Sequence, residues 1–153
     1  MTTVKLTRQE MRTAAYTGVE RQLHALSKNL TNLYGASERK TEWQNNVVGA
    51  IGEYALAKHL NMYWNPAVDV DLNALPGDVG TYQIRTTGWP QGCLLIRPRD
   101  KMEAPFVLAV IEGNIVTFKG WLYGFESKTV GELRDNDTYW VKQDKLHPME
   151  TLR

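Results

Sequence analysis

The feature that most constrains the fold is a continuous apolar run at residues 106–111, in the second half of the chain. A run of this length and composition is typical of a β-strand that is buried on both faces. Gly113 and Asn114 follow it, and such a pair favours a tight turn into a second strand, which we expect at residues 115–123. The sequence therefore predicts a central pair of strands joined by a tight turn.

A long helix is predicted near the N-terminus. Thr7 and Glu10 form a capping box, in which the threonine side chain and the glutamate three residues later bond reciprocally to the backbone. The apolar residues that follow recur at spacings of three and four, and we expect them to form a buried stripe: Met11, Ala15, Val19, Leu23, Leu26, Leu30 and Leu33. We expect the helix to end at Tyr34 and Gly35, with a break near Gly18.

A second helix is predicted from about residue 41 to residue 61, and it contains two glycines, Gly49 and Gly52. Each glycine costs about 0.8–1 kcal/mol relative to alanine inside a helix, so we expect another part of the chain to approach this helix backbone closely. Glu53 lies beside these glycines, on a face that it shares with Asn46. Glu53 is therefore either a functional carboxylate beside bare backbone or a surface glutamate on a helix that presses on a sheet.

A Pro-Gly turn brings Asp78 to the start of a predicted strand at residues 82–87. Because successive side chains of a strand point to opposite faces, one face carries a polar row: Thr81, Gln83, Arg85 and Thr87. This row is either the solvated face of an edge strand or part of a functional site. We expect residues 93–97 to form a β-hairpin with this strand across a loop at residues 88–92. A last short strand is expected at residues 138–142.

The composition fits one globular domain of 153 residues, 42% of them hydrophobic. The single cysteine, Cys93, cannot form an internal disulfide, and no apolar segment approaches the roughly 18 residues that cross a bilayer. We therefore expect a soluble protein of the cytoplasm, with no membrane partner. The net charge of +1 does not by itself indicate a nucleic-acid partner, so any affinity for DNA must come from a local basic patch.

Three segments together resemble the PD-(D/E)XK nuclease superfamily: residues 49–55, which contain Glu53, then Gly77 with Asp78, and residues 83–87. In that restriction-endonuclease-like fold, a helix supplies a glutamate and a strand supplies an aspartate. An acidic-x-lysine triplet completes the site.

The resemblance covers roughly residues 42–123, about half of the chain. It implies an α/β (α+β) fold with a restriction-endonuclease-like core, in which helices flank a central mixed β-sheet. Residues 1–35 would form an N-terminal helical extension of this single domain, and residues 124–153 would form a C-terminal strand and tail.

The resemblance further implies a divalent-metal-dependent DNA nuclease, encoded by a phage or mobile element and working in the cytoplasm of the host cell. Mg²⁺ or Mn²⁺ would be the cofactor, because hard cations prefer oxygen ligands and activate water for phosphodiester hydrolysis. The implied catalytic residues are Glu53, Asp78, Gln83 and Arg85. The implied metal ligands are Asp78, Glu53, Gln83 and the backbone carbonyl of Ile84.

Two positions depart from the family pattern. Gln83 stands where the family has a second acid, so it offers a metal an oxygen without a charge. Arg85 stands where the family has lysine, and its guanidinium can clamp a phosphate but cannot act as a base. The alternative function is therefore a catalytically inactive nuclease-like protein that binds nucleic acid or inhibits a host factor.

The expected partner is DNA in duplex form. The residues expected to contact it are two threonines of the site strand and a basic cluster after the next strand: Thr86, Thr87, Arg97, Arg99 and Lys101. The alternatives are that the threonines only favour the strand, and that the cluster is a solvated loop diluted by Asp100 and Glu103. A homodimer is an option, since two active sites are the simplest route to cutting two strands.

Overall fold

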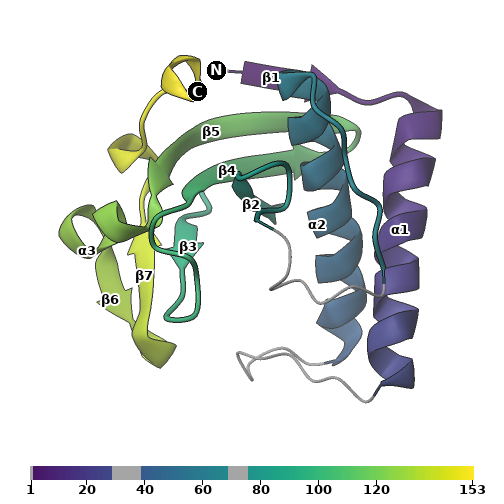
Figure 1. Ribbon diagram of the computed structural model, residues 1–153, viewed down its shortest axis with the longest axis horizontal. Coiled ribbons are helices and arrows are strands. Elements are labelled where there is room, and N and C mark those ends of the chain that lie inside the picture. The colour runs from purple at the N-terminus through teal and green to yellow at the C-terminus, as the bar shows by residue number, and fades with distance from the viewer. Residues whose placement is uncertain (1, 29–38, 69–75) are drawn as a thin grey trace.

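The computed structural model describes residues 2–28, 39–68 and 76–153 of the chain, and it is an α+β structure (Figure 1). Two long helices, α1 (Arg8–Ser27) and α2 (Arg39–Leu60), pack side by side, and α2 lies against a mixed four-stranded sheet. A small antiparallel sheet and the short helix α3 (Ser127–Val130) lie on the side away from the helix pair. Within the described residues, we find no helix that is long and apolar enough to cross a membrane.

The larger sheet has the strand order β1 (Thr2–Lys5), β5 (Ile115–Tyr123), β4 (Pro105–Glu112), β2 (Gln83–Thr87). β4 and β5 are antiparallel and are joined at Gly113, whose φ is 61°, so the predicted central pair is confirmed. β1, which the sequence did not indicate, adds to the edge of the sheet antiparallel to β5. The sheet is mixed because β2 runs parallel to β4.

The smaller sheet has the strand order β3 (Leu94–Ile96), β7 (Thr138–Val141), β6 (Glu132–Arg134). β7 confirms the predicted last strand. Four short 3₁₀ turns complete the C-terminal part: Gly124–Glu126, Asp135–Asp137, Gln143–Lys145 and Met149–Thr151. The tail packs back on the larger sheet, since His147 pairs with Trp121 and Met149 is buried.

The predicted hairpin between residues 82–87 and residues 93–97 is wrong. β2 pairs with β4 and β3 pairs with β7, so the two segments belong to different sheets. The physical reason is that their apolar side chains complete different hydrophobic clusters. Ile84 of β2 is buried under α2, whereas Leu94 and Ile96 of β3 pack with Val141 in a second cluster.

The helix α1 begins as predicted. The backbone N–H of Thr7 donates to the Glu10 carboxylate at 2.8 Å, and the N–H of Glu10 donates to Thr7 Oγ1 at 3.2 Å. These two bonds are the reciprocal capping box, so the N-cap and the start of the helix follow from the local sequence.

The predicted apolar stripe of α1 is only partly correct, because Met11 packs against the core but two of its leucines do not. Leu23 and Leu26 are exposed, and the buried face is made of other residues: Ala14, Thr17, Gly18 and Gln22. A Cβ at Gly18 would lie 2.6 Å from the backbone oxygen of Asn46, so the two helices cross at this glycine and α1 continues through it without a break. The last positions predicted for this helix lie outside the described residues: Leu30, Leu33, Tyr34 and Gly35.

One of the two glycines in α2 is a point of close approach, as predicted. A Cβ at Gly52 would lie 1.8 Å from Thr86 Oγ1, so the backbone of α2 presses on the side chain of a β2 residue. The prediction is wrong for Gly49, where a Cβ would meet nothing within 4 Å. The contact at Gly52 brings the next residue, Glu53, beside the start of β2.

Candidate functional site

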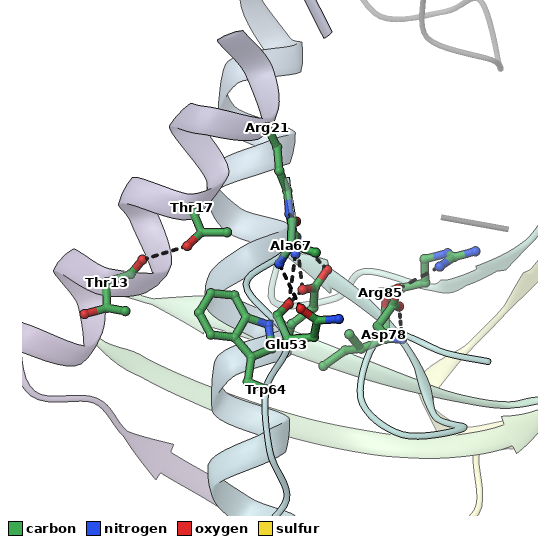
Figure 2. Close-up of polar contacts among 10 residues, drawn as sticks. Thr13, Thr17, Arg21, Glu53, Trp64, Ala67, Asp78 and Arg85 are labelled. Atoms are coloured by element: carbon green, nitrogen blue, oxygen red, sulfur yellow. Dashed lines mark hydrogen bonds and ion pairs between the residues drawn. The ribbon is translucent and has the colours of Figure 1, made fainter. Parts of the chain in front are cut away.

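Two of the predicted site residues, Glu53 and Asp78, lie near each other between α2 and the start of β2. Figure 2 shows Arg21 and Trp64 gathered around Glu53, with Asp78 and Arg85 on the side toward β2. The two carboxylates are close enough to interact electrostatically, since the negative charge of Asp78 raises the pKa of Glu53. The structure therefore brings together two acids that are far apart in the sequence.

The carboxylate of Asp78 is fixed by the turn that precedes β2. Its Oδ2 accepts a hydrogen bond from the N–H of Ile84 at 2.9 Å, and its own N–H donates to the Tyr82 carbonyl at 2.9 Å. Gly80, with a φ of 58°, permits the tight return between these residues. Asp78 thus faces the first residues of β2, where the backbone carbonyl of Ile84 also lies.

The carboxylate of Glu53 accepts three hydrogen bonds from two side chains. Arg21 Nη1 lies 3.0 Å from each of its oxygens, and Trp64 Nε1 donates to Oε2 at 3.0 Å. A carboxylate accepts about four hydrogen bonds. The bonds from the described residues therefore leave room for one more partner, such as a water molecule.

Burial raises the pKa of both acids above their ordinary values of 4.5 for Glu53 and 3.8 for Asp78, because a weakly polar environment disfavours the charged form. The charge of Arg21 opposes this at Glu53, and the N–H of Ile84 opposes it most strongly at Asp78. A cation near the two carboxylates would relieve both the burial cost and their mutual repulsion.

Arg85 lies on the face of β2 that points away from α2. Its side chain is held by Asp100. Its Nη2 donates to Asp100 Oδ1 at 2.7 Å, and its guanidinium lies 5.1 Å from the centre of the Phe106 ring. The second oxygen of Asp100 accepts the backbone N–H of Arg97 at 2.7 Å. Arg85 Nε is buried and has no hydrogen-bond partner in the described part of the chain. The guanidinium of Arg85 is thus fixed by a neighbouring loop.

The other predicted residues of β2 divide between its two faces. Gln83 begins the strand, half-buried, beside Phe106 of β4. Thr86 faces α2, and its Oγ1 is buried against Gly52 without a hydrogen-bond partner among the described residues. The hydroxyl of Thr86 is therefore not presented to a nucleic acid. Thr87 Oγ1 accepts the N–H of Trp89 at 3.1 Å.

The predicted basic cluster lies in the loop that carries Asp100. Arg99 is exposed, whereas Arg97 and Lys101 are half-buried. Because Asp100 contacts Arg85, this loop is adjacent to the site. Arg99 is the member of the cluster that is most accessible to a DNA backbone.

Three residues that hold the site were not predicted: Arg21, Trp64 and Asp100. Arg21 lies on the first helix, 32 residues before Glu53, and Asp100 lies 15 residues after Arg85. Neither separation forms a pattern within one helix or strand. Only the packing of α1 against α2, and of the loop before β4 against β2, places them.

The donors around Asp78 fit a hard divalent cation. They are oxygens, the Asp78 carboxylate and the Ile84 carbonyl, with Glu53 nearby, and Mg²⁺ and Mn²⁺ prefer oxygen ligands. In the residues that the structure describes, no three His, Cys, Asp or Glu side chains are grouped to hold a metal ion. The donor set therefore suits an ion that keeps most of its water, with Asp78 as its direct carboxylate ligand.

Comparison with known proteins adds no family to this description. No protein-family model matches the chain, and no match was found among curated proteins or solved structures. The functional assignment therefore depends on the chemistry of the site itself.

Proposed function

We propose that the protein is a divalent-metal-dependent DNA nuclease with a restriction-endonuclease-like core. The observation that carries this proposal is the pair of half-buried carboxylates, Glu53 and Asp78, which are close enough to repel each other beside the backbone of Ile84. Two neighbouring acids with raised pKa values are a common signature of functional chemistry, because holding them together away from water is costly.

The residues of the site would have separate roles in phosphodiester hydrolysis. A bound Mg²⁺ or Mn²⁺ supplies an acidified water and charge stabilisation. Asp78, with the Ile84 carbonyl and the Gln83 amide, would hold the ion. Glu53 has one acceptor position left for a water, and it would orient that water toward the phosphate.

Arg85 has an electrostatic part in this scheme. Its guanidinium stays charged in proteins, so it cannot remove a proton from water. Fixed charges that face a developing negative charge lower the barrier, and a guanidinium matches the geometry of phosphate oxygens. We therefore assign Arg85 to the phosphate and assign proton transfer to solvent.

Incubation of the protein with supercoiled plasmid, linear duplex and single-stranded DNA tests the proposal. We expect cleavage of at least one of these substrates in Mg²⁺ or Mn²⁺, and no cleavage when a chelator is present. If every substrate stays intact in both ions, the protein is not a nuclease.

A second function, metal-independent binding of nucleic acid, is favoured by one observation: both charged side chains that would act on the phosphate or the water are already paired. Arg85 pairs with Asp100 and Glu53 pairs with Arg21. The double variant Gln83→Glu, Arg85→Lys, which restores the family triplet, separates the two functions. A nuclease should gain at least about tenfold in cleavage rate, since the ion gains a charged ligand. A gain in metal affinity without cleavage supports the binding protein.

A further inference from the structure

We propose that Arg21, on the N-terminal helix, is a positioning residue of the candidate site that keeps Glu53 from coordinating the metal ion directly and holds it ready for a water. The expected effect on cleavage depends on the proposed nuclease function. The expected effect on metal binding does not.

The guanidinium of Arg21 is held by contacts with several segments of the chain. Besides the two bonds from Nη1 to Glu53, its Nε donates to the Ala67 carbonyl at 3.0 Å, and its Nη2 lies 3.5 Å from the Asn65 carbonyl. The guanidinium thus ties together α1, α2 and the segment that carries Trp64 (Figure 2). Lysine cannot reproduce this set, because its donors radiate from one nitrogen.

Burial separates this ion pair from an ordinary surface contact. The side chains of Arg21 and Glu53 are only 17% and 14% exposed. Ion pairs on the surface contribute little to stability, because both side chains move freely in water. In contrast, removing one partner of a buried pair leaves the other with an uncompensated charge. The orientation of Glu53 therefore depends on Arg21.

The charge of Arg21 also limits the affinity of the site for a cation. Among the described residues, the site contains three carboxylates and two guanidinium groups: Glu53, Asp78, Asp100, Arg21 and Arg85. When all are ionised, one net negative charge remains. Neutralising Arg21 doubles that charge and frees the oxygens of Glu53, so a divalent ion should bind more tightly. At the same time, Glu53 loses the geometry that suits it to orient a water.

A positioning role therefore predicts opposite changes in two measurements. In Arg21→Gln, we expect calorimetric titration to show Mn²⁺ binding about tenfold tighter than in the parent, while kcat for DNA cleavage falls about tenfold or more. A residue that only supports the fold would weaken both together, or change neither. Mn²⁺ affinity that is unchanged or weaker in Arg21→Gln overturns the proposal, whether or not the parent cuts DNA.

The matched control is Lys58→Gln. Lys58 also comes from the helix pair and forms an ion pair between α2 and α1, with Glu10 at 2.9 Å, but it is not part of the site. Its loss changes the net charge equally, and we expect Mn²⁺ affinity within twofold of the parent. An equal gain in affinity in Lys58→Gln would attribute the effect to bulk charge and would also overturn the proposal.

Two further outcomes are decisive. If the parent binds no detectable Mn²⁺, Arg21→Gln is expected to gain binding, and no binding in either protein refutes the inference. If Arg21→Gln does not fold, we use Arg21→Lys instead, because lysine keeps the positive charge but lacks the several separated donors of the guanidinium. For that variant we expect Mn²⁺ affinity within about threefold of the parent and a lower kcat, and a large loss of affinity contradicts the proposal.

Discussion

Asp78→Asn is expected to lower kcat for DNA cleavage by about 1,000-fold or more, because it removes the carboxylate that we propose as the direct ligand of the metal ion. The fold should remain, since the side-chain oxygen of asparagine can still accept the N–H of Ile84 that Asp78 accepts at 2.9 Å. Initial cleavage rates at saturating DNA and fixed Mg²⁺, with circular dichroism of the same samples, measure both effects.

The control for this substitution is Asp144→Asn, which neutralises an exposed aspartate on a 3₁₀ turn outside the site. We expect its kcat to stay within twofold of the parent. If Asp78→Asn cuts as fast as Asp144→Asn, Asp78 has no part in catalysis and the proposed site is wrong.

Gly52→Ala is expected to destabilise the protein by about 2 kcal/mol, although alanine is normally the better helix former. The new Cβ would lie 1.8 Å from Thr86 Oγ1 and 2.9 Å from Thr86 Cβ. Thr86 belongs to β2 and has a stiff, β-branched side chain, so α2 must move away from the sheet. Urea denaturation at equilibrium measures the loss in the free energy of unfolding.

Gly49→Ala serves as the control, because it makes the same chemical change one turn earlier in the same helix. A Cβ at Gly49 meets nothing within 4 Å, so only helix propensity acts, and we expect a gain of about 0.5–1 kcal/mol. The two substitutions should therefore have opposite signs. A stabilising Gly52→Ala would show that α2 does not press on Thr86.

The elements that the sequence predicted correctly are those specified by local signals. The capping box of Thr7 and Glu10 determines where α1 begins, because both partners lie within one turn. The apolar run at residues 106–111 with the turn at Gly113 determines the β4–β5 pair, because adjacent antiparallel strands need only a short connection.

The errors concern contacts between distant segments. Alternation in β2 indicates which side chains share a face but not which strand is its neighbour, so the parallel pairing with β4 was not foreseen. In α1, the leucines suggested the buried face, but the close crossing at Gly18 buries small and polar residues instead, such as Thr17 and Gln22. Packing geometry overrides hydrophobicity there.

The site was predicted in the same uneven way. Glu53 and Asp78 were expected from the glycine-flanked helix, the turn and the family resemblance, and the structure places them together. Arg21, the partner of Glu53, and Asp100, the partner of Arg85, are ordinary surface residues in the sequence, because these ion pairs form only when separate elements pack. Arg21 reduces the negative charge of the site, whereas Asp100 offsets the positive charge of Arg85.

Calorimetric titration of the parent protein and of Asp78→Asn with Mn²⁺ shows directly whether Asp78 anchors a divalent cation. We expect the parent to bind a single Mn²⁺ and the substitution to weaken this binding at least about tenfold, since it would remove the one carboxylate that we propose to contact the ion directly. Equal binding of Mn²⁺ by the two proteins would rule out Asp78 as the anchor of the ion.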